Sequence, residues 1–187
     1  KANGQGFLPG PRMAAAVRPR QLFTQVPGAK RVQLTNTAYS HRSPAVSPDG
    51  KWIAFIADVD LRPDSLVEAI ADSLARLPYD AARDEVDRNE SDIYVIPVAG
   101  GTPRKVATLG GTESDLTWSP DGRRLAIIHR PGRVKQAHFG VLDVATGQVT
   151  PMAAGWRYEP ASLAWLPSGD IAVSADIGGA SGLFLVN

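Results

Sequence analysis

Short apolar runs alternate with turn-forming residues along this chain, and one combination of turn and run occurs three times. The turns are Ser47-Pro48-Asp49-Gly50, Ser119-Pro120-Asp121-Gly122 and a degraded copy, Leu166-Pro167-Ser168-Gly169. Proline presets φ for the second turn position, aspartate suits the third and glycine tolerates the fourth. Because apolar runs flank each turn, each one predicts an antiparallel β-hairpin. Copies with matching flanks indicate a repeat fold.

The runs that follow the turns superpose as Ile53-Ala54-Phe55, Leu125-Ala126-Ile127 and Ile171-Ala172-Val173. Apolar residues at consecutive positions are typical of a strand covered on both faces, as when sheets stack about 10 Å apart. The central alanine of each run would allow neighbouring sheets to approach closely. The separation of Pro120 and Pro167 is close to the ~40–45 residues of a four-stranded propeller blade.

This repeat predicts an all-β fold, a partial β-propeller of four-stranded antiparallel blades over 21–187. We assign a half blade to 21–35 and a blade with an insertion to 43–109. A second whole blade covers 115–152, and an incomplete blade covers 162–187. Propellers close with typically ~4–8 blades. We therefore expect a fragment of a longer protein, or a ring completed by partner chains, with apolar faces bare on the first and last blades.

The insertion in the first whole blade covers 58–91. Ser65-Leu66-Val67-Glu68 matches a capping box, and Pro78 would stop a helix. Between them, apolar residues recur at helical spacing, at Leu66, Ile70, Leu74 and Leu77. This predicts one amphipathic helix in a helical insertion of about 61–78. It has a functional interpretation, as a specificity wall, and a structural one, as a helix on the outside of its own blade.

The chain begins with Lys1 rather than methionine, and the segment that follows is rich in glycine and proline. We expect 1–20 to form an extended N-terminal arm of a processed or cut chain. These features lean slightly towards an exported protein, periplasmic or extracellular, over a cytoplasmic one. The sequence does not decide the compartment.

Composition excludes several functional classes. The 187 residues are 43% hydrophobic and 21% charged, as in globular proteins. A net charge of +1 with scattered charges gives no electrostatic case for binding nucleic acid or an anionic membrane. No apolar run reaches the ~18–20 residues of a membrane span. The absence of cysteine excludes disulfides, thiolate metal sites and a cysteine nucleophile.

The residues that most resemble metal sites have structural interpretations. His129 and His138 are predicted to lie near each other across a hairpin, but neither they nor His41 have the spacing of a zinc site. We expect strand-end or surface histidines. Three aspartates flank the insertion, but they lack the dense oxygen ligands of a calcium loop, so we expect solvated strand ends at Asp58, Asp60 and Asp92.

Other candidates are weaker still. Gly100-Gly101-Thr102 lacks the Gly-Lys-Ser/Thr ending of a phosphate loop. Trp118 and Trp165 occupy matching repeat positions and are predicted to lie in the core. The segment 156–158, with Trp156, Arg157 and Tyr158, has two interpretations, the lining of a peptide channel and a packed blade edge.

The repeat resembles the WD-like propeller repeats of the TolB type, which occur in TolB and in the propellers of the prolyl oligopeptidase family. The resemblance covers about 21–187 and rests on the Ser-Pro-Asp-Gly turns, Ile53-Ala54-Phe55, Asp92-Ile93-Tyr94-Val95 and the Gly100–Lys105 segment. The run from Tyr39 to Lys105, with an insertion that begins Leu61-Arg62-Pro63-Asp64-Ser65, is most similar to bacterial acylaminoacyl-peptidase-type members.

That resemblance implies a propeller that precedes an α/β-hydrolase domain with a Ser-Asp-His triad and limits access to short peptides. The nearest approach to a nucleophile elbow, Gly179-Ala180-Ser181-Gly182-Leu183, has leucine at the last glycine and falls in a predicted hairpin turn. We therefore expect no catalytic, metal-binding or cofactor-binding residue in this chain. The implied role is the non-catalytic scaffold and substrate gate of a serine peptidase. Its implied partners are the remaining blades, the hydrolase domain and a peptide substrate.

Two alternatives stay open. One is a TolB-like protein-interaction propeller without enzymatic activity. The other is a propeller fused to a metal-dependent amidohydrolase. The repeat itself does not separate them, because one fold serves many functions.

Overall fold

The computed structural model describes residues 19–37, 39–61, 76, 89–132 and 135–187, and in these residues all regular structure is β-strand. The predicted extended arm and the predicted helix of the insertion lie outside these residues, apart from the ends of their ranges. None of the described residues form a helix of the length and hydropathy needed to cross a membrane.

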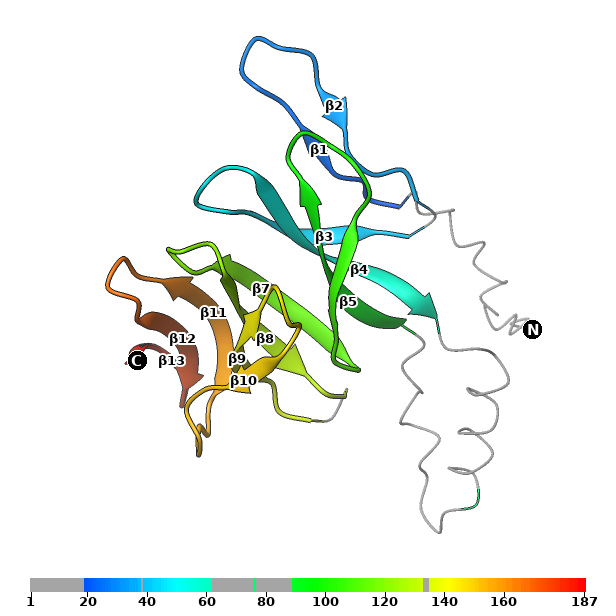
Figure 1. Ribbon diagram of the computed structural model, residues 1–187. Helices are drawn as coiled ribbons and strands as arrows, with labels where there is room; N and C mark the ends of the chain where they lie inside the picture. Colours follow the sequence, from blue (N-terminus) through cyan, green and yellow to red (C-terminus); the bar gives the residue numbers. More distant parts are fainter. Residues whose placement is uncertain (1–18, 38, 62–75, 77–88, 133–134) are drawn as a thin grey trace, which may run out of the picture.

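The strands form four antiparallel sheets, which we number 1 to 4 in chain order (Figure 1). Sheet 1 pairs β1 (Phe23–Thr24) with β2 (Val32–Gln33). Sheet 2 has the order β3-β4-β5-β6, with bounds His41–Val46, Trp52–Leu61, Asn89–Pro97 and Arg104–Thr108.

Sheet 3 has the order β7-β8-β9-β10, with bounds Thr112–Trp118, Arg124–Arg130, His138–Asp143 and Val149–Pro151. Sheet 4 has the order β11-β12-β13, with bounds Glu159–Trp165, Ile171–Ile177 and Ala180–Val186. The first strand of sheet 3, β7, contacts the first strands of both neighbouring sheets, β3 and β11. Each sheet is thus one blade, and the predicted all-β partial propeller is confirmed.

Apolar packing between successive sheets forms the core. Ala54 and Ile56 face sheet 3, whereas Ile53 and Phe55 on the same strand pack towards sheet 1. The same split holds in sheet 3, where Ile127 packs towards sheet 2 and its neighbours on β8 pack towards sheet 4. Burial of both faces explains why the second strand of each blade is apolar at consecutive positions.

The repeated turns close their hairpins with the same hydrogen bonds. Ser47 Oγ donates to Asp49 Oδ1 (2.6 Å) and accepts from the Trp52 amide (2.9 Å). Gly50 lies at φ +70°, a region that glycine occupies without steric cost. In the second copy, Ser119 Oγ donates to Asp121 Oδ1 (2.5 Å) and holds the pKa of that carboxyl below its usual range.

Replacing Ser119 with alanine is expected to lower the free energy of unfolding by roughly 1–3 kcal/mol. Ser119 is fully buried, and its hydroxyl is the acceptor for the Arg124 amide at 2.9 Å. Loss of the hydroxyl leaves that amide without this partner. Urea unfolding measures the change. The control is Ser168→Ala in the exposed third turn, which is expected to change stability by less than ~0.5 kcal/mol. Equal effects of the two substitutions would contradict a structural role for the repeated turn.

A bulge interrupts the first strand of each complete blade. The register of β3 shifts between Arg42 and Ala45, and that of β7 between Ser114 and Thr117. Inside these bulges, φ is +50° at Ser43 and +55° at Asp115. The Asp115 carboxylate then reaches sheet 4, where it accepts a hydrogen bond from the amide of Leu163. The bulge in β7 therefore directs a side chain to the next blade.

Candidate functional site

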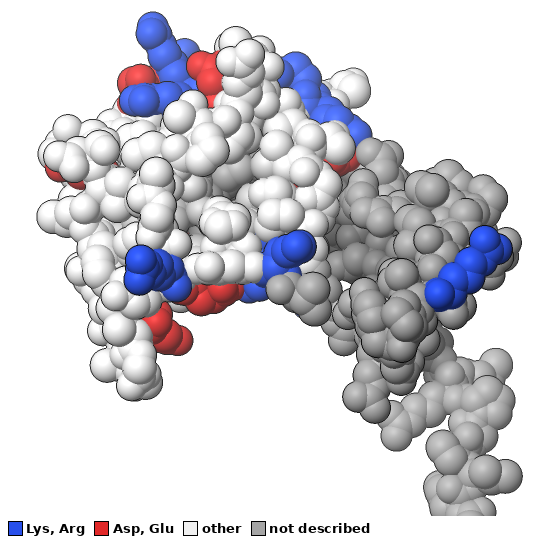
Figure 2. Space-filling view, turned by 90° about the horizontal axis from the view of Figure 1, so that it is seen from below, with Lys and Arg blue, Asp and Glu red and all other residues white. Residues whose placement is uncertain are grey.

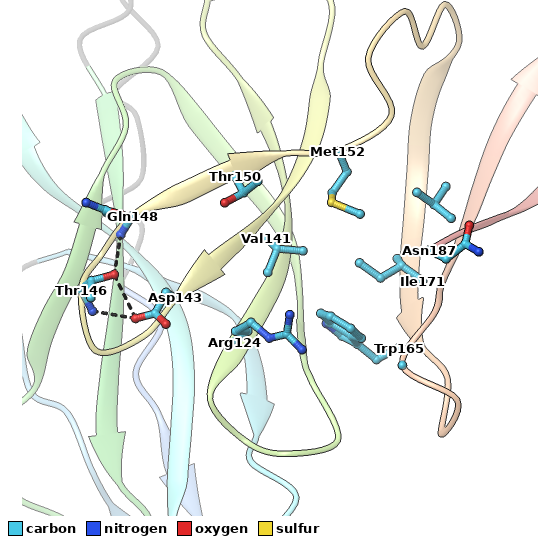
Figure 3. Close-up of a pocket in the computed structure, with 12 residues that line it drawn as sticks. Arg124, Val141, Asp143, Thr146, Gln148, Thr150, Met152, Trp165, Ile171 and Asn187 are labelled. Carbon is cyan, nitrogen blue, oxygen red and sulfur yellow. Dashed lines mark hydrogen bonds between the residues drawn. The ribbon is translucent and has the colours of Figure 1, made fainter.

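A pocket lies between sheets 3 and 4, at the end of the blades that carries the repeated turns (Figure 3). Its volume is about 440 Å³. That is within the range of ~300–1,000 Å³ that is usual for small-ligand sites. The apolar side chains that line it come from both sheets and are Val141, Met152, Ile171 and Val186. The polar side chains come from β10 and the turn before it and are Thr146, Gln148 and Thr150.

A cation and an indole face each other in this pocket. The guanidinium carbon of Arg124 lies 5.2 Å from the centroid of the Trp165 ring, within the range of a cation–π interaction. Arg124 follows the turn 119–122, and Trp165 ends β11. Within the described parts of the chain, the Arg124 side chain has no ion pair within 4.0 Å and no hydrogen bond. Its N–H donors are therefore available to a ligand.

Asp143 is the cross-strand neighbour of Arg124 and organises the adjacent turn. Its Oδ1 accepts hydrogen bonds from the Thr146 amide (2.8 Å), the Thr146 hydroxyl (2.9 Å) and the Ala145 amide (3.0 Å). The bonds from Thr146 are the main reason that the pKa of Asp143 lies below its usual range. The pocket therefore holds one guanidinium and one ionised carboxylate that is bound to its own turn.

The gap between sheets 2 and 3 is the structural counterpart of this pocket, with a volume of about 370 Å³. Trp52 occupies the position of Arg124, as the second residue after the repeated turn. Arg104 crosses the gap and donates to the Val144 carbonyl oxygen (3.2 Å). Trp118, the counterpart of Trp165, donates from Nε1 to the Ala45 carbonyl oxygen (2.9 Å).

The pocket between sheets 3 and 4 departs from this arrangement at each of these positions. Thr150 takes the place of Arg104, since the two pair with the equivalent residues Val141 and Val95. It is too short to cross the gap. The buried Trp165 Nε1 has no hydrogen-bond partner within the described residues. The pocket is thus larger and has a cation where its counterpart has an indole.

A second group of ionisable side chains is buried between sheets 2 and 3. Glu113 and Asp92 are 1% and 0% exposed. Ser91 Oγ donates to Glu113 Oε2 (2.7 Å), and Lys105 Nζ lies 2.6 Å from Asp92 Oδ2. Burial raises the pKa of Glu113 to about 7, and the charge of Asp92 adds to this effect. The expectation that Asp92 is a solvated strand end is wrong, because Lys105 from β6 pairs with it in the interior.

His41 and His129 have backbone partners, whereas His138 is exposed. His129 and His138 are cross-strand neighbours, as predicted, and His129 Nε2 lies 2.8 Å from the Gly110 carbonyl oxygen. His41 begins β3 but is buried, between the rings of Tyr39 and Phe55. His41 is therefore a strand-end histidine, as expected, and not a surface one. Across the described ranges, no group of three His, Asp or Glu side chains is placed to hold a metal ion.

The remaining candidates have structural positions. Gly100 and Gly101 form the turn between β5 and β6, at φ +94° and +136°. Ser181 lies in β13, not in the hairpin turn, and its hydroxyl donates to Asp176 Oδ1 (2.9 Å). Trp156 packs edge-on against the aromatic rings of sheets 3 and 4, with centroids 5.2 Å from Phe139 and 4.9 Å from Phe184. Trp156 is thus packed at a blade edge, whereas Arg157 and Tyr158 beside it are exposed.

Sequence reasoning placed Trp165 in the core, but it is half-buried and lines the pocket. The same reasoning did not single out Arg124, Asp143 or Glu113. Aligning the repeats would have identified Arg124, because it stands where the first repeat has Trp52. No local pattern marks Glu113, whose burial depends on packing against sheet 2. Figure 2 adds that the Lys, Arg, Asp and Glu side chains on the face it shows lie in small separate groups.

These features define a partial β-propeller whose blades resemble those of TolB and of peptidase propellers. No protein-family model matches the chain. It is 28% identical over 139 residues to dipeptidyl-peptidase 5 of Aspergillus fumigatus, which covers 71% of this chain and 18% of that protein. It is 29% identical over 135 residues to the TolB homolog of Chlorobium luteolum, which covers 65% of this chain and 30% of that protein. The chain thus spans less than a third of either relative.

Solved structures agree on the fold. TolB from Acinetobacter baumannii superposes with a TM-score of 0.56 and 19% identity, over 84% of this chain and 32% of that one. An oligogalacturonate lyase in complex with manganese gives a TM-score of 0.56 at 14% identity, over 86% and 39% of the two chains. At these identities the likeness concerns the propeller fold alone.

Proposed function

We propose that this chain is the non-catalytic propeller part of a serine peptidase, in which it acts as scaffold and substrate gate for short peptides. The observation that carries the proposal is the sequence similarity to dipeptidyl-peptidase 5 over 71% of the chain. In this role the propeller covers the active site of a hydrolase domain and excludes folded proteins. The insertion at 58–91 is a predicted specificity wall of the same gate.

Contacts between blades support a scaffold role. The hydrogen bond from Trp118 to Ala45 joins sheets 2 and 3, and that from Leu163 to Asp115 joins sheets 3 and 4. Both involve the first strands, which contact one another. Blades fixed to each other at these strands form a connected wall, as a scaffold requires.

A second candidate is a protein-interaction propeller without enzymatic activity. The 29% identity to a TolB homolog over 65% of the chain favours this candidate as strongly as the similarity to dipeptidyl-peptidase 5 favours the peptidase. The two candidates differ in what the full-length protein does to a peptide bond. An interaction propeller has no nucleophilic serine.

The full-length protein is expected to react with a fluorophosphonate probe and to cleave chromogenic dipeptides, because a serine peptidase has an activated serine hydroxyl. Blocked and unblocked dipeptides report the preferred amino terminus. Denatured casein and a folded protein serve as length controls and should stay intact. Labelling without length discrimination would contradict the gate. Absence of both labelling and hydrolysis would contradict the peptidase and leave the interaction propeller.

A further inference from the structure

We propose that the pocket between sheets 3 and 4 is a binding site for a carboxylate group of a peptide, with Arg124 as its anchor and an apolar side chain of the ligand on the pocket floor. This site goes beyond the proposed function and does not depend on peptidase activity. It lies at the turn end of the blades, between the outer strand β10 and sheet 4 (Figure 3).

The first argument is the state of Arg124. Its guanidinium carbon lies 5.2 Å from the centroid of the Trp165 ring, and its N–H groups are hydrogen-bond donors. A guanidinium edge matches a carboxylate through two parallel hydrogen bonds. Since the described residues supply no acceptor for these donors, a ligand carboxylate would be their partner.

The second argument is charge. Asp143 is ionised beside Arg124, and Asp121 in the preceding turn is also ionised and senses the charge of Arg124. Their negative charges disfavour a ligand with two charges on one group, such as phosphate, more than a single carboxylate. Both carboxylates accept hydrogen bonds within their own turns, so they do not take the place of the ligand.

The third argument is the lining. Val141, Met152, Ile171 and Val186 provide an apolar surface, and Thr146 and Thr150 add hydroxyl groups to the lining, with Thr150 beside its cross-strand partner Val141. Apolar walls with a few polar groups are typical of ligand sites. A volume of about 440 Å³ accommodates a short stretch of peptide rather than a single small anion.

The fourth argument is the comparison with the gap between sheets 2 and 3. There, Arg104 crosses the gap and its guanidinium donates to the Val144 carbonyl oxygen, while Trp52 stands at the position of Arg124. At the position of Arg124, the gap between sheets 2 and 3 therefore has an indole instead of a cation.

The test measures binding of capped tripeptides to the full-length protein by NMR line broadening and tryptophan fluorescence. Acetyl-Leu-Asp-Leu-amide presents a side-chain carboxylate, and acetyl-Leu-Ala-Leu with a free carboxyl terminus presents a terminal one. Acetyl-Leu-Asn-Leu-amide has no carboxylate, and inorganic phosphate tests the preference for a single charge. Binding of either carboxylate peptide, and of neither control, is the expected result, and the stronger of the two identifies the source of the carboxylate.

Arg124→Gln is expected to weaken carboxylate binding at least tenfold, and Arg124→Lys to weaken it less. Arg124 is exposed, so the substitution should not prevent folding. The matched control is Arg123→Gln, since Arg123 is the exposed neighbour that does not line this pocket. Unchanged binding in Arg124→Gln, equal loss in Arg123→Gln, or absence of carboxylate binding would each overturn the proposal.

Discussion

Replacing Glu113 with glutamine is expected to stabilise the protein by roughly 3 kcal/mol at pH 8 and to leave its stability nearly unchanged below pH 4.5. Burial raises the pKa of Glu113 from 4.5 to about 7 in the folded protein. A carboxyl whose pKa is higher in the folded state binds its proton more tightly there. Its contribution to the free energy of unfolding is therefore fully present below pH 4.5 and is lost as the pH rises through 7.

Glutamine imitates the protonated form of Glu113 at every pH. Its carbonyl oxygen can still accept the hydrogen bond from Ser91 Oγ. The other ionisable groups around Glu113 are Arg42 on β3, Asp92 on β5, with its partner Lys105 on β6, and His129, its cross-strand neighbour on β8. Since these groups remain in the variant, the difference between the two proteins reports Glu113.

Urea unfolding of the full-length protein between pH 4.5 and 8 measures this difference. The expected result is a gap between variant and wild type that opens as the pH rises. Glu159→Gln is the control, because Glu159 is half-exposed and pairs with Arg130 at the surface. That change is expected to cost ~0–1 kcal/mol. A gap that does not depend on pH would contradict a raised pKa at Glu113.

The fold could be predicted because its signals are local. Ser47 and Asp49 form their hydrogen bonds within one turn, and the apolar run 53–55 is buried on both faces because sheets lie on both sides of it. Repetition then converts one local signal into an architecture. None of these inferences needed contacts between distant residues.

The features that the sequence did not predict depend on contacts between strands or between blades. The first strands begin earlier than predicted, at Thr112 and Glu159, because the bulges at Asp115 and after Pro160 break the alternation that marks a strand. The sequence predicted a solvated Asp92, because its partner Lys105 lies on the next strand, β6, and no local pattern marks the pair. The pocket between sheets 3 and 4 combines residues from two blades, so a linear sequence does not display it.

The outer face of sheet 4 has the chemistry of a surface that another blade covers. Leu183 and Leu185 are 74% and 66% exposed there. Their register partners on β12 show that they correspond to Phe139 and Val141 of sheet 3, which pack against sheet 4. The same positions in sheet 2 are fully buried against sheet 3, at Ile93 and Val95. We propose that a further blade packs on this face in the full-length protein.

Leu185→Asp is therefore expected to lower the free energy of unfolding of the full-length protein by about 3 kcal/mol or more, because it buries a carboxylate without a partner. Val26→Asp is the matched control, since Val26 is similarly exposed, at 69%, but lies in the loop between β1 and β2. It is expected to change stability by less than ~0.5 kcal/mol. Thermal and urea unfolding provide the measurement. Equally small effects of the two substitutions would mean that the face stays open to solvent, because a leucine already in water loses little when it becomes an aspartate.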